Sequence, residues 1–177
     1  VDSNQSWTLP QAKSVLRGLE PFSPLFAEEP LPANAPLRDW EALAESTSIP
    51  LAGGENIYGT RAFLRMTDAG LQYVQPDVAK WGGVSGALAL AAALPDGVSL
   101  WPHFMGTAVG QTAALSVTAA VGEGSVCEMD VNDNPLRSEL CGDCLDVADE
   151  DVTLPQKPGL VIPPLEAQLT EFGTAAA

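Results

Sequence analysis

Short apolar runs alternate along this chain with longer segments whose apolar residues recur at helical spacing. In the first long segment, Pro10 lies where a proline favours the start of a helix. The apolar residues that follow share one helical face: Leu9, Ala12, Val15, Leu16 and Leu19. The same spacing predicts helices over residues 37–45, 60–67, 85–94 and 107–120. Alternation of short strands with helices predicts a parallel sheet joined by crossover helices.

Each short apolar run ends at a carboxylate or at the only histidine of the chain. These residues are Asp2, Glu28, Glu55, Asp77, His103 and Glu128. They are separated by 26, 27, 22, 26 and 25 residues, which is about the length of one strand, one helix and two loops. In a parallel barrel successive strands end on the same face, so we expect these side chains to converge on one pocket.

The chain shows six such strand ends, whereas a closed (β/α)8 barrel has eight strands. We therefore expect an α/β fold of the TIM-barrel type that is incomplete in this chain. Two strands are either missing or supplied by another chain. Residues 1–137 are expected to form the partial barrel. Residues 138–177 are rich in proline, and we expect them to wrap the barrel exterior, with one helical signal over residues 165–172.

The charge balance limits the classes of partner. The chain has 23 acidic and 8 basic residues, a formal net charge of −15. Binding to nucleic acid or to an anionic membrane needs clustered Lys and Arg, so we expect neither. The richest apolar stretch, residues 87–94, is too short to span a bilayer. The opening residues Val1-Asp2-Ser3 lack a basic and an apolar region, so no secretory signal is expected at this start.

The three cysteines indicate a reducing compartment. Cys141 and Cys144 have the spacing of a redox or zinc pair, but no second Cys or His pair lies near them. We interpret the pair as structural or incidental. Without a disulfide framework, a cytoplasmic location is the simplest expectation.

Three acids at consecutive strand ends suggest a metal site. Asp2, Glu28 and Glu55 offer the hard oxygen ligands that Mg²⁺ prefers. The alternative is that each acid caps the helix that follows it. Glu28 is followed directly by Glu29, and only one of the two can face the pocket. The other would face the surrounding helices and pair there with Arg or Lys, and spacing alone does not choose between them.

His103 and Asp77 end neighbouring predicted strands. Such strands lie about 4.8 Å apart, so a hydrogen bond between the two side chains is within reach. An aspartate in this position fixes the tautomer of the imidazole and raises its basicity. The alternative is a histidine with a structural role only. Lys80 follows Asp77 closely, and it either faces the pocket or neutralises a neighbouring acid.

Several short motifs at the strand ends resemble those of the mandelate racemase subgroup of the enolase superfamily. The similarity runs from the third barrel strand to about residue 137. The motifs are Val1-Asp2-Ser3-Asn4-Gln5, Glu28-Glu29-Pro30, Gly54-Glu55-Asn56, Gln75-Pro76-Asp77 with Lys80-Trp81-Gly82-Gly83, Pro102-His103-Phe104, and Glu128.

The resemblance implies abstraction of a proton α to a carboxylate. It implies that Asp2, Glu28 and Glu55 bind a Mg²⁺ ion that chelates the substrate carboxylate and stabilises the enediolate. His103, oriented by Asp77, would exchange a proton on one face of the substrate. Protonated Glu128 would donate a hydrogen bond to an enediolate oxygen, Asn4 would contact a substrate hydroxyl, and Lys80 is the second substrate-binding candidate.

The resemblance also limits the activity to a few reactions of small carboxylates. We expect an acid-sugar dehydratase in the parent enzyme, because Asn4 and the histidine–aspartate pair suit a polyhydroxylated acid. The alternative is a racemase, epimerase or cycloisomerase of a 2-hydroxy or sugar acid. A third possibility is an inactive fragment, because the family's lysine at the second strand is absent from this chain. The resemblance further implies a homo-oligomer of the full-length protein.

Overall fold

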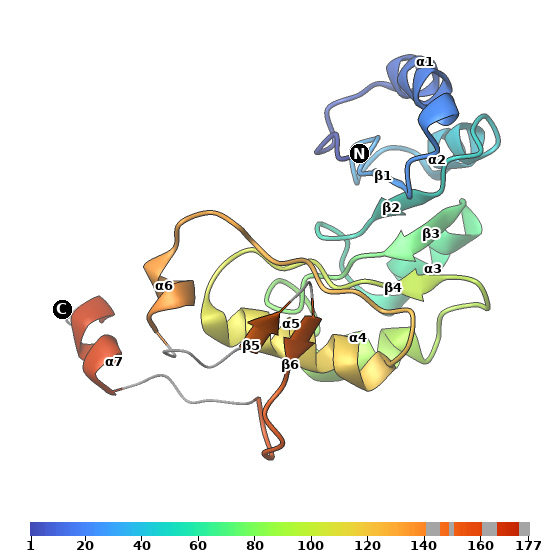
Figure 1. Cartoon of the computed structure of the whole chain (residues 1–177). Helices are drawn as coiled ribbons and strands as arrows, with labels where there is room; N and C mark the ends of the chain where they lie inside the picture. The colour runs from blue at the N-terminus through green and yellow to red at the C-terminus, as the bar shows by residue number, and fades with distance from the viewer. Residues whose placement is uncertain (141–145, 149–150, 161–165, 174–177) are drawn as a thin grey trace.

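A parallel sheet in chain order forms the centre of the molecule. The computed structural model describes residues 1–140, 146–148, 151–160 and 166–173. Four hydrogen-bonded strands lie side by side in sequence order: β1 (Ala27–Glu28), β2 (Leu51–Gly53), β3 (Leu71–Val74) and β4 (Ser99–Leu100). Every neighbouring pair among them is parallel, as Figure 1 shows.

Two further segments extend this sheet at its edges. Residues 1–3 run beside β1, where the amide of Ser3 donates to the carbonyl of Glu28 at 3.1 Å. On the other side, the amide of Glu128 donates to the carbonyl of Pro102 at 3.3 Å, so the segment before Glu128 follows the course of β4. The predicted strand ends from Asp2 to His103 follow one parallel sheet, and Glu128 lies beside its last strand through this single hydrogen bond. The predicted α/β class is confirmed.

Five longer helices connect these strands, close to where the apolar periodicity predicts them. They are α1 (Leu9–Leu19), α2 (Leu37–Ala44), α3 (Thr60–Asp68), α4 (Gly83–Ala91) and α5 (Ala108–Val121). The largest difference from prediction is α4, which begins two residues earlier and ends three residues earlier than expected. Gly82, with a φ of 73°, lets the chain turn directly into this helix.

The core lies between the sheet and the helices. Each of the five helices contributes a side chain with no exposed surface: Leu16, Leu43, Phe63, Leu90 and Val117. Leu51, Leu71 and Val74 meet them from the strands, each at most 1% exposed. This continuous apolar layer fixes the strands, and with them the residues at the strand ends.

Gly70 sets the distance between two of the helices. It lies just after Ala69, the C-cap of α3, and has a φ of 100°, the conformation expected beyond a helix C-terminus. A Cβ atom at this position would lie 2.4 Å from the Cβ of Ala44 at the end of α2. The helices pack closely here because residue 70 has no side chain.

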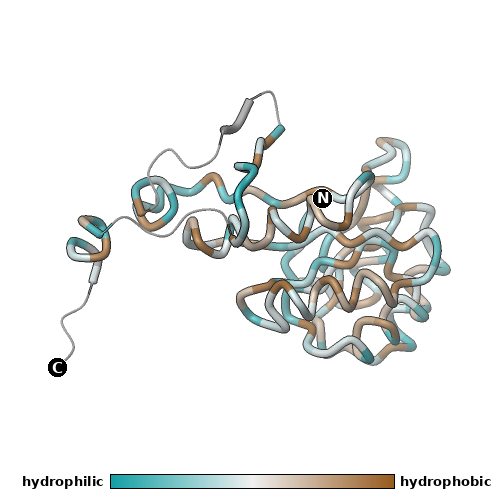
Figure 2. The backbone as a smooth tube through the Cα atoms, turned by 90° about the horizontal axis from the view of Figure 1, so that it is seen from below, coloured by the Kyte–Doolittle hydropathy of each residue, from teal (hydrophilic) through white to brown (hydrophobic). Residues whose placement is uncertain are grey.

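The C-terminal part contains shorter elements. These are α6 (Pro135–Ser138), the antiparallel pair β5 (Asp146–Ala148) and β6 (Asp151–Thr153), and α7 (Glu166–Phe172), near the predicted helical signal. Residues 151–154 and Gln156 line a cavity of about 460 Å³ together with α5 and residues 125–127. Figures 1 and 2 show α7 away from the sheet. Wrapping of a barrel by residues 138–177 stays a prediction, and Cys141 and Cys144 lie outside the described residues.

The helices of the described segments are all too short or too polar to cross a membrane.

Candidate active site

Asp77 and His103 form a buried pair just beyond the C-terminal ends of β3 and β4. The two residues form an isolated parallel bridge just beyond the strands, and each is 4% exposed. His103 Nδ1 lies 3.0 Å from Asp77 Oδ2. The strand register therefore brings the predicted pair into hydrogen-bonding contact.

Asp77 is fixed from two sides. Its Oδ1 accepts hydrogen bonds from the backbone amides of Ala79, at 2.8 Å, and Lys80, at 3.0 Å. Burial acts to raise the pKa of Asp77, but the hydrogen bonds from His103 and these amides outweigh burial and hold the pKa below its ordinary value. Asp77 is therefore ionised at neutral pH and keeps the proton of His103 on Nδ1.

The opposite nitrogen of His103 faces two further carboxylates. Nε2 lies 2.9 Å from Glu55 Oε2 and 3.6 Å from Glu128 Oε2. Burial acts to lower the pKa of His103, but the hydrogen bond to Asp77 and the charges of Glu55 and Glu128 raise the pKa above its ordinary value. The imidazole can hold a proton at Nε2, on the side that faces the acids.

Glu55 also binds groups from its own side of the site. Its Oε1 accepts hydrogen bonds from Asn56 Nδ2 at 2.8 Å and from Lys80 Nζ at 3.1 Å. Lys80 Nζ is also 3.8 Å from Asp77 Oδ2. Of the two alternatives for Lys80, the structure shows neutralisation of neighbouring acids.

Glu28 and Asp2 form the other part of the acidic cluster. Glu28 Oε1 accepts a hydrogen bond from Gln75 Nε2 at 2.9 Å. Burial, followed by the charge of Asp2, raises the pKa of Glu28 to about 7. Asp2 is exposed, and its Oδ1 accepts a hydrogen bond from the amide of Asn4 at 2.8 Å. This part of the site has more negative charge than its own residues neutralise.

Glu28 and Glu29 lie in different surroundings. Glu29 has a φ of 41°, is 4% exposed, and lies in a narrow hollow against Trp40 and Ile57. Its Oε2 accepts a hydrogen bond from Gln5 Nε2 at 3.0 Å, so its partner is an amide and not the expected Arg or Lys. Glu28 is thus the residue beside Asp2 and Gln75.

The side chains of Asp2, Glu28 and Glu55 are of the chemical type that binds Mg²⁺. The donors are carboxylate oxygens, and the raised pKa of Glu28 shows that a positive charge nearby would be favourable. Across the described residues no three Asp, Glu, His or Cys side chains stand in a geometry ready to hold a metal ion. Glu55 is instead turned toward Lys80 and His103, so the structure shows an ion-pair network at the expected metal site.

Sequence reasoning did not single out Gln75 and Asn56. Their side-chain amides donate hydrogen bonds to Glu28 and Glu55, respectively. Gln75 had a signal: it precedes Asp77 by two residues, and alternate residues of an extended chain share a face. The contact of Asn56 with its neighbour Glu55 has no such periodic signal.

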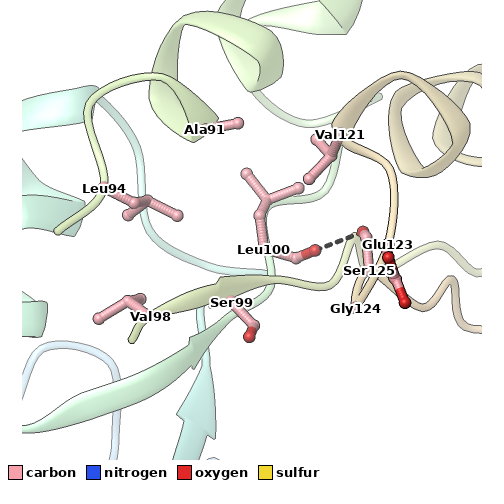
Figure 3. A pocket seen from close by; sticks show the side chains of 9 residues that line it. All are labelled: Ala91, Leu94, Val98, Ser99, Leu100, Val121, Glu123, Gly124 and Ser125. Carbon is pink, nitrogen blue, oxygen red and sulfur yellow. Dashed lines mark hydrogen bonds between the residues drawn. The ribbon is translucent and has the colours of Figure 1, made fainter. Parts of the chain in front are cut away.

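A second hollow lies at the far end of β4. Figure 3 shows it between the end of α4, the start of β4 and the loop after α5, with Ser125 Oγ donating to the carbonyl of Leu100 at 2.6 Å. Its volume is about 150 Å³, and it is lined by apolar side chains together with Ser99, Glu123 and Ser125. None of the strand-end acids lines it, so the candidate chemistry belongs to the opposite end of the strands.

Known proteins with similar sequences indicate the family of this chain. A family model described as "Enolase C-terminal domain-like" matches residues 1–168. A D-galactonate dehydratase of Variovorax paradoxus is 42% identical over 110 residues, which are 61% of this chain and 28% of that protein.

Solved structures match over nearly the whole chain. A mandelate racemase/muconate lactonizing enzyme from Bordetella bronchiseptica superposes with a TM-score of 0.85 at 38% identity, covering 96% of this chain and 48% of that one. The 3,6-anhydro-D-galactonate cycloisomerase from Zobellia galactanivorans gives 0.87 at 27% identity, covering 97% and 49%. The chain thus spans about half the length of these structures and about a quarter of the dehydratase. With the family match extending over residues 1–168, the chain belongs to the enolase C-terminal domain-like family.

Proposed function

We propose that the whole protein is a Mg²⁺-dependent sugar-acid dehydratase and that this chain carries part of its (β/α)8 barrel, strands three to eight. The observation that carries the proposal is the orientation of His103. Its Nδ1 is anchored on buried Asp77, and its Nε2 faces the acids at the other strand ends. A histidine held in this way is positioned for proton transfer, since one nitrogen is fixed and the other is directed into the site.

Loss of water from a 2,3-dihydroxy acid breaks two bonds. The α-carbon loses a proton to a base, a role that the resemblance gives to the family's second-strand lysine outside this chain. The β-carbon loses its hydroxyl group, which needs a proton to leave as water. His103 fits the second task, because its raised pKa favours a proton on Nε2. The resulting enol becomes a 2-keto-3-deoxy acid.

Glu128 suits a supporting role. Burial acts first to raise its pKa, and the charges of Glu55 and Asp2 act in the same direction. A carboxyl group that keeps its proton can donate a hydrogen bond to a substrate oxygen on which negative charge develops. Asn4 and Lys80 are the proposed substrate-binding residues.

Asp2, Glu28 and Glu55 are the residues that would hold the Mg²⁺ ion. The bound ion would supply positive charge beside the substrate carboxylate and so make the α-proton more acidic. The small-molecule sugar acid, the homo-oligomeric state and the cytoplasmic location are parts of the same proposal. The D-galactonate dehydratase relatives support the substrate class.

The Zobellia structure supports a second candidate, cycloisomerase or racemase activity on a related acid, because it is named as an anhydro-galactonate cycloisomerase. Both reactions begin with exchange of the α-proton. They differ in whether water is lost.

The experiment is to incubate the complete protein with Mg²⁺ and a panel of aldonic and anhydro-aldonic acids in D₂O. Proton NMR follows the α-proton, and semicarbazide detects the 2-keto product. We expect keto product from a sugar acid, and we expect His103→Asn to abolish it while Mg²⁺ still binds. Exchange without loss of water would favour the second candidate. No exchange and no product with any acid would overturn both.

A further inference from the structure

Lys80 is a basic residue whose ammonium group lies among the strand-end acids. Its backbone is fixed in the loop between β3 and α4, where its amide donates to Asp77 Oδ1 at 3.0 Å. Its side chain reaches back to Glu55 Oε1 at 3.1 Å and lies 3.8 Å from Asp77 Oδ2. The side chain is 36% exposed, so the ammonium lies at the open side of the cluster.

Glu55 has both carboxylate oxygens bound to basic groups of the same chain. Lys80 binds Oε1, and His103 Nε2 lies 2.9 Å from Oε2. Glu28, by contrast, accepts its hydrogen bond from the neutral amide of Gln75. Of the three proposed metal ligands, Glu55 is therefore the one whose negative charge is already paired with basic side chains of this chain, Lys80 and His103.

A divalent cation and an ammonium group compete for one carboxylate. Both are attracted to the same oxygens, and they repel each other at short range. Binding of a metal ion by Glu55 therefore requires that Lys80 leave Oε1. The four-carbon side chain of lysine permits this movement while the backbone stays fixed.

We propose that Lys80 is an internal counter-cation that occupies Glu55 in the metal-free protein and is released when a divalent cation binds. This inference rests on the proposed function, because it takes Glu55 as a metal ligand. Once released, the ammonium group is free to meet the carboxylate of an incoming substrate. Substrate engagement by Lys80 then depends on prior binding of the metal.

The first test measures Mg²⁺ binding to the complete protein by calorimetry. Lys80→Met removes the competing charge and should tighten Mg²⁺ binding about fivefold, as expected for loss of one partly exposed ion pair. Lys80→Arg keeps the charge and should stay within about twofold of the wild type. Lys13→Met, in α1, is the matched control and should bind Mg²⁺ as the wild type does.

Equal affinity of the wild type and Lys80→Met overturns the counter-cation role but leaves the metal site standing. Failure of the wild type to bind Mg²⁺ overturns the proposed function and this inference with it. Circular dichroism of each variant establishes that the protein compared is folded.

A second test observes the lysine directly in the wild-type protein. Reductive methylation with ¹³C-formaldehyde labels lysines and keeps their charge, and the Lys80→Arg spectrum assigns the Lys80 signal. Mg²⁺ should shift the Lys80 signal and leave the Lys13 signal unchanged. A Lys80 signal that does not move at saturating Mg²⁺ contradicts its release.

Discussion

At the scale of single residues, the imidazole of His103 connects the two halves of the site. Asp77 lies on one side of it, and Glu55 and Glu128 lie on the other. A protonated imidazole adds a second positive charge among these three acids, beside that of Lys80. The raised pKa of His103 and the lowered pKa of Asp77 are two results of the same contact.

Replacing Asp77 with Asn should test this coupling. The substitution removes the carboxylate whose hydrogen bond does most to raise the pKa of His103, so that pKa should fall. If protonated His103 is the acid, the limb of the pH–rate profile that reports it should move to lower pH, and kcat should fall by about 100-fold or more. A purely structural Asp77 would lower stability without moving that limb. His103→Asn provides the baseline without any imidazole.

The residue scale also shows where sequence reasoning reaches its limit. The Asp77–His103 contact follows from strand register, so it could be predicted from spacing alone. The choice between Glu28 and Glu29 could not, because it depends on the positive φ of Glu29 and on the hydrogen bond from Gln5. The pairing of Glu55 with Lys80 depends on side-chain conformation across two loops, which no periodic pattern records.

At the scale of elements, apolar periodicity predicted the helices well because each buries one stripe of side chains against the sheet. The short strands were recognised by the residues at their ends more than by their own alternation. The early start of α4 was missed because it depends on the left-handed conformation of Gly82. Elements are therefore most predictable where burial determines them, and least where the backbone turns.

Gly70 provides a test at this scale, with Gly18 as its matched control. Gly70→Ala places a methyl group 2.4 Å from the Cβ of Ala44, in a backbone conformation with a φ of 100°. We expect it to lower the free energy of unfolding by about 2 kcal/mol or more. Gly18→Ala lies in α1 with no neighbouring atom within 4 Å, and should raise the free energy of unfolding by about 0.5–1 kcal/mol.

Urea denaturation of both variants measures the two effects. Equal free energies of unfolding for Gly70→Ala and the wild type would mean that α2 and α3 separate without cost. They would contradict the close packing described for these helices.

At the scale of the whole molecule, the formal charge of −15 and the acids gathered at the strand ends both add negative charge repulsion to the folded state. Folding brings together carboxylates that are far apart in an unfolded chain. The pKa values of Glu28, Glu29 and Glu128 are all raised, in each case with burial as the largest cause. Folding therefore costs free energy because it buries these carboxylates and, to a smaller extent, because it crowds their negative charges.

This crowding predicts how stability changes with pH when Mg²⁺ is absent. A raised pKa in the folded state gives stability that is complete below the unfolded value, 4.5 for Glu28, and is lost as pH rises toward the folded value of about 7. His103 acts in the same direction from its unfolded value of 6.5 upward. Asp77, with its lowered pKa, acts the other way, and its contribution is lost as pH falls through its folded value, below the unfolded value of 3.8.

The free energy of unfolding should therefore decrease from about pH 5 to pH 8. Urea denaturation across this range measures it, and Glu28→Gln should reduce the slope. Saturating Mg²⁺ should reduce the slope as well, if the acids bind the ion. A free energy of unfolding that is flat over this range in metal-free buffer would contradict the crowding of charge.

The order of the strands has a consequence for how the protein is made. Each strand of the sheet pairs with the one that precedes it along the chain, from residues 1–3 through β4 to the segment before Glu128. Every new strand therefore closes a loop of similar length, about 25 residues, at a similar entropic cost. A sheet of this kind can grow in the direction of synthesis, because each emerging segment finds its partner strand already made. His103 is then positioned only when its own strand leaves the ribosome, after Asp77, its hydrogen-bond partner, is in place.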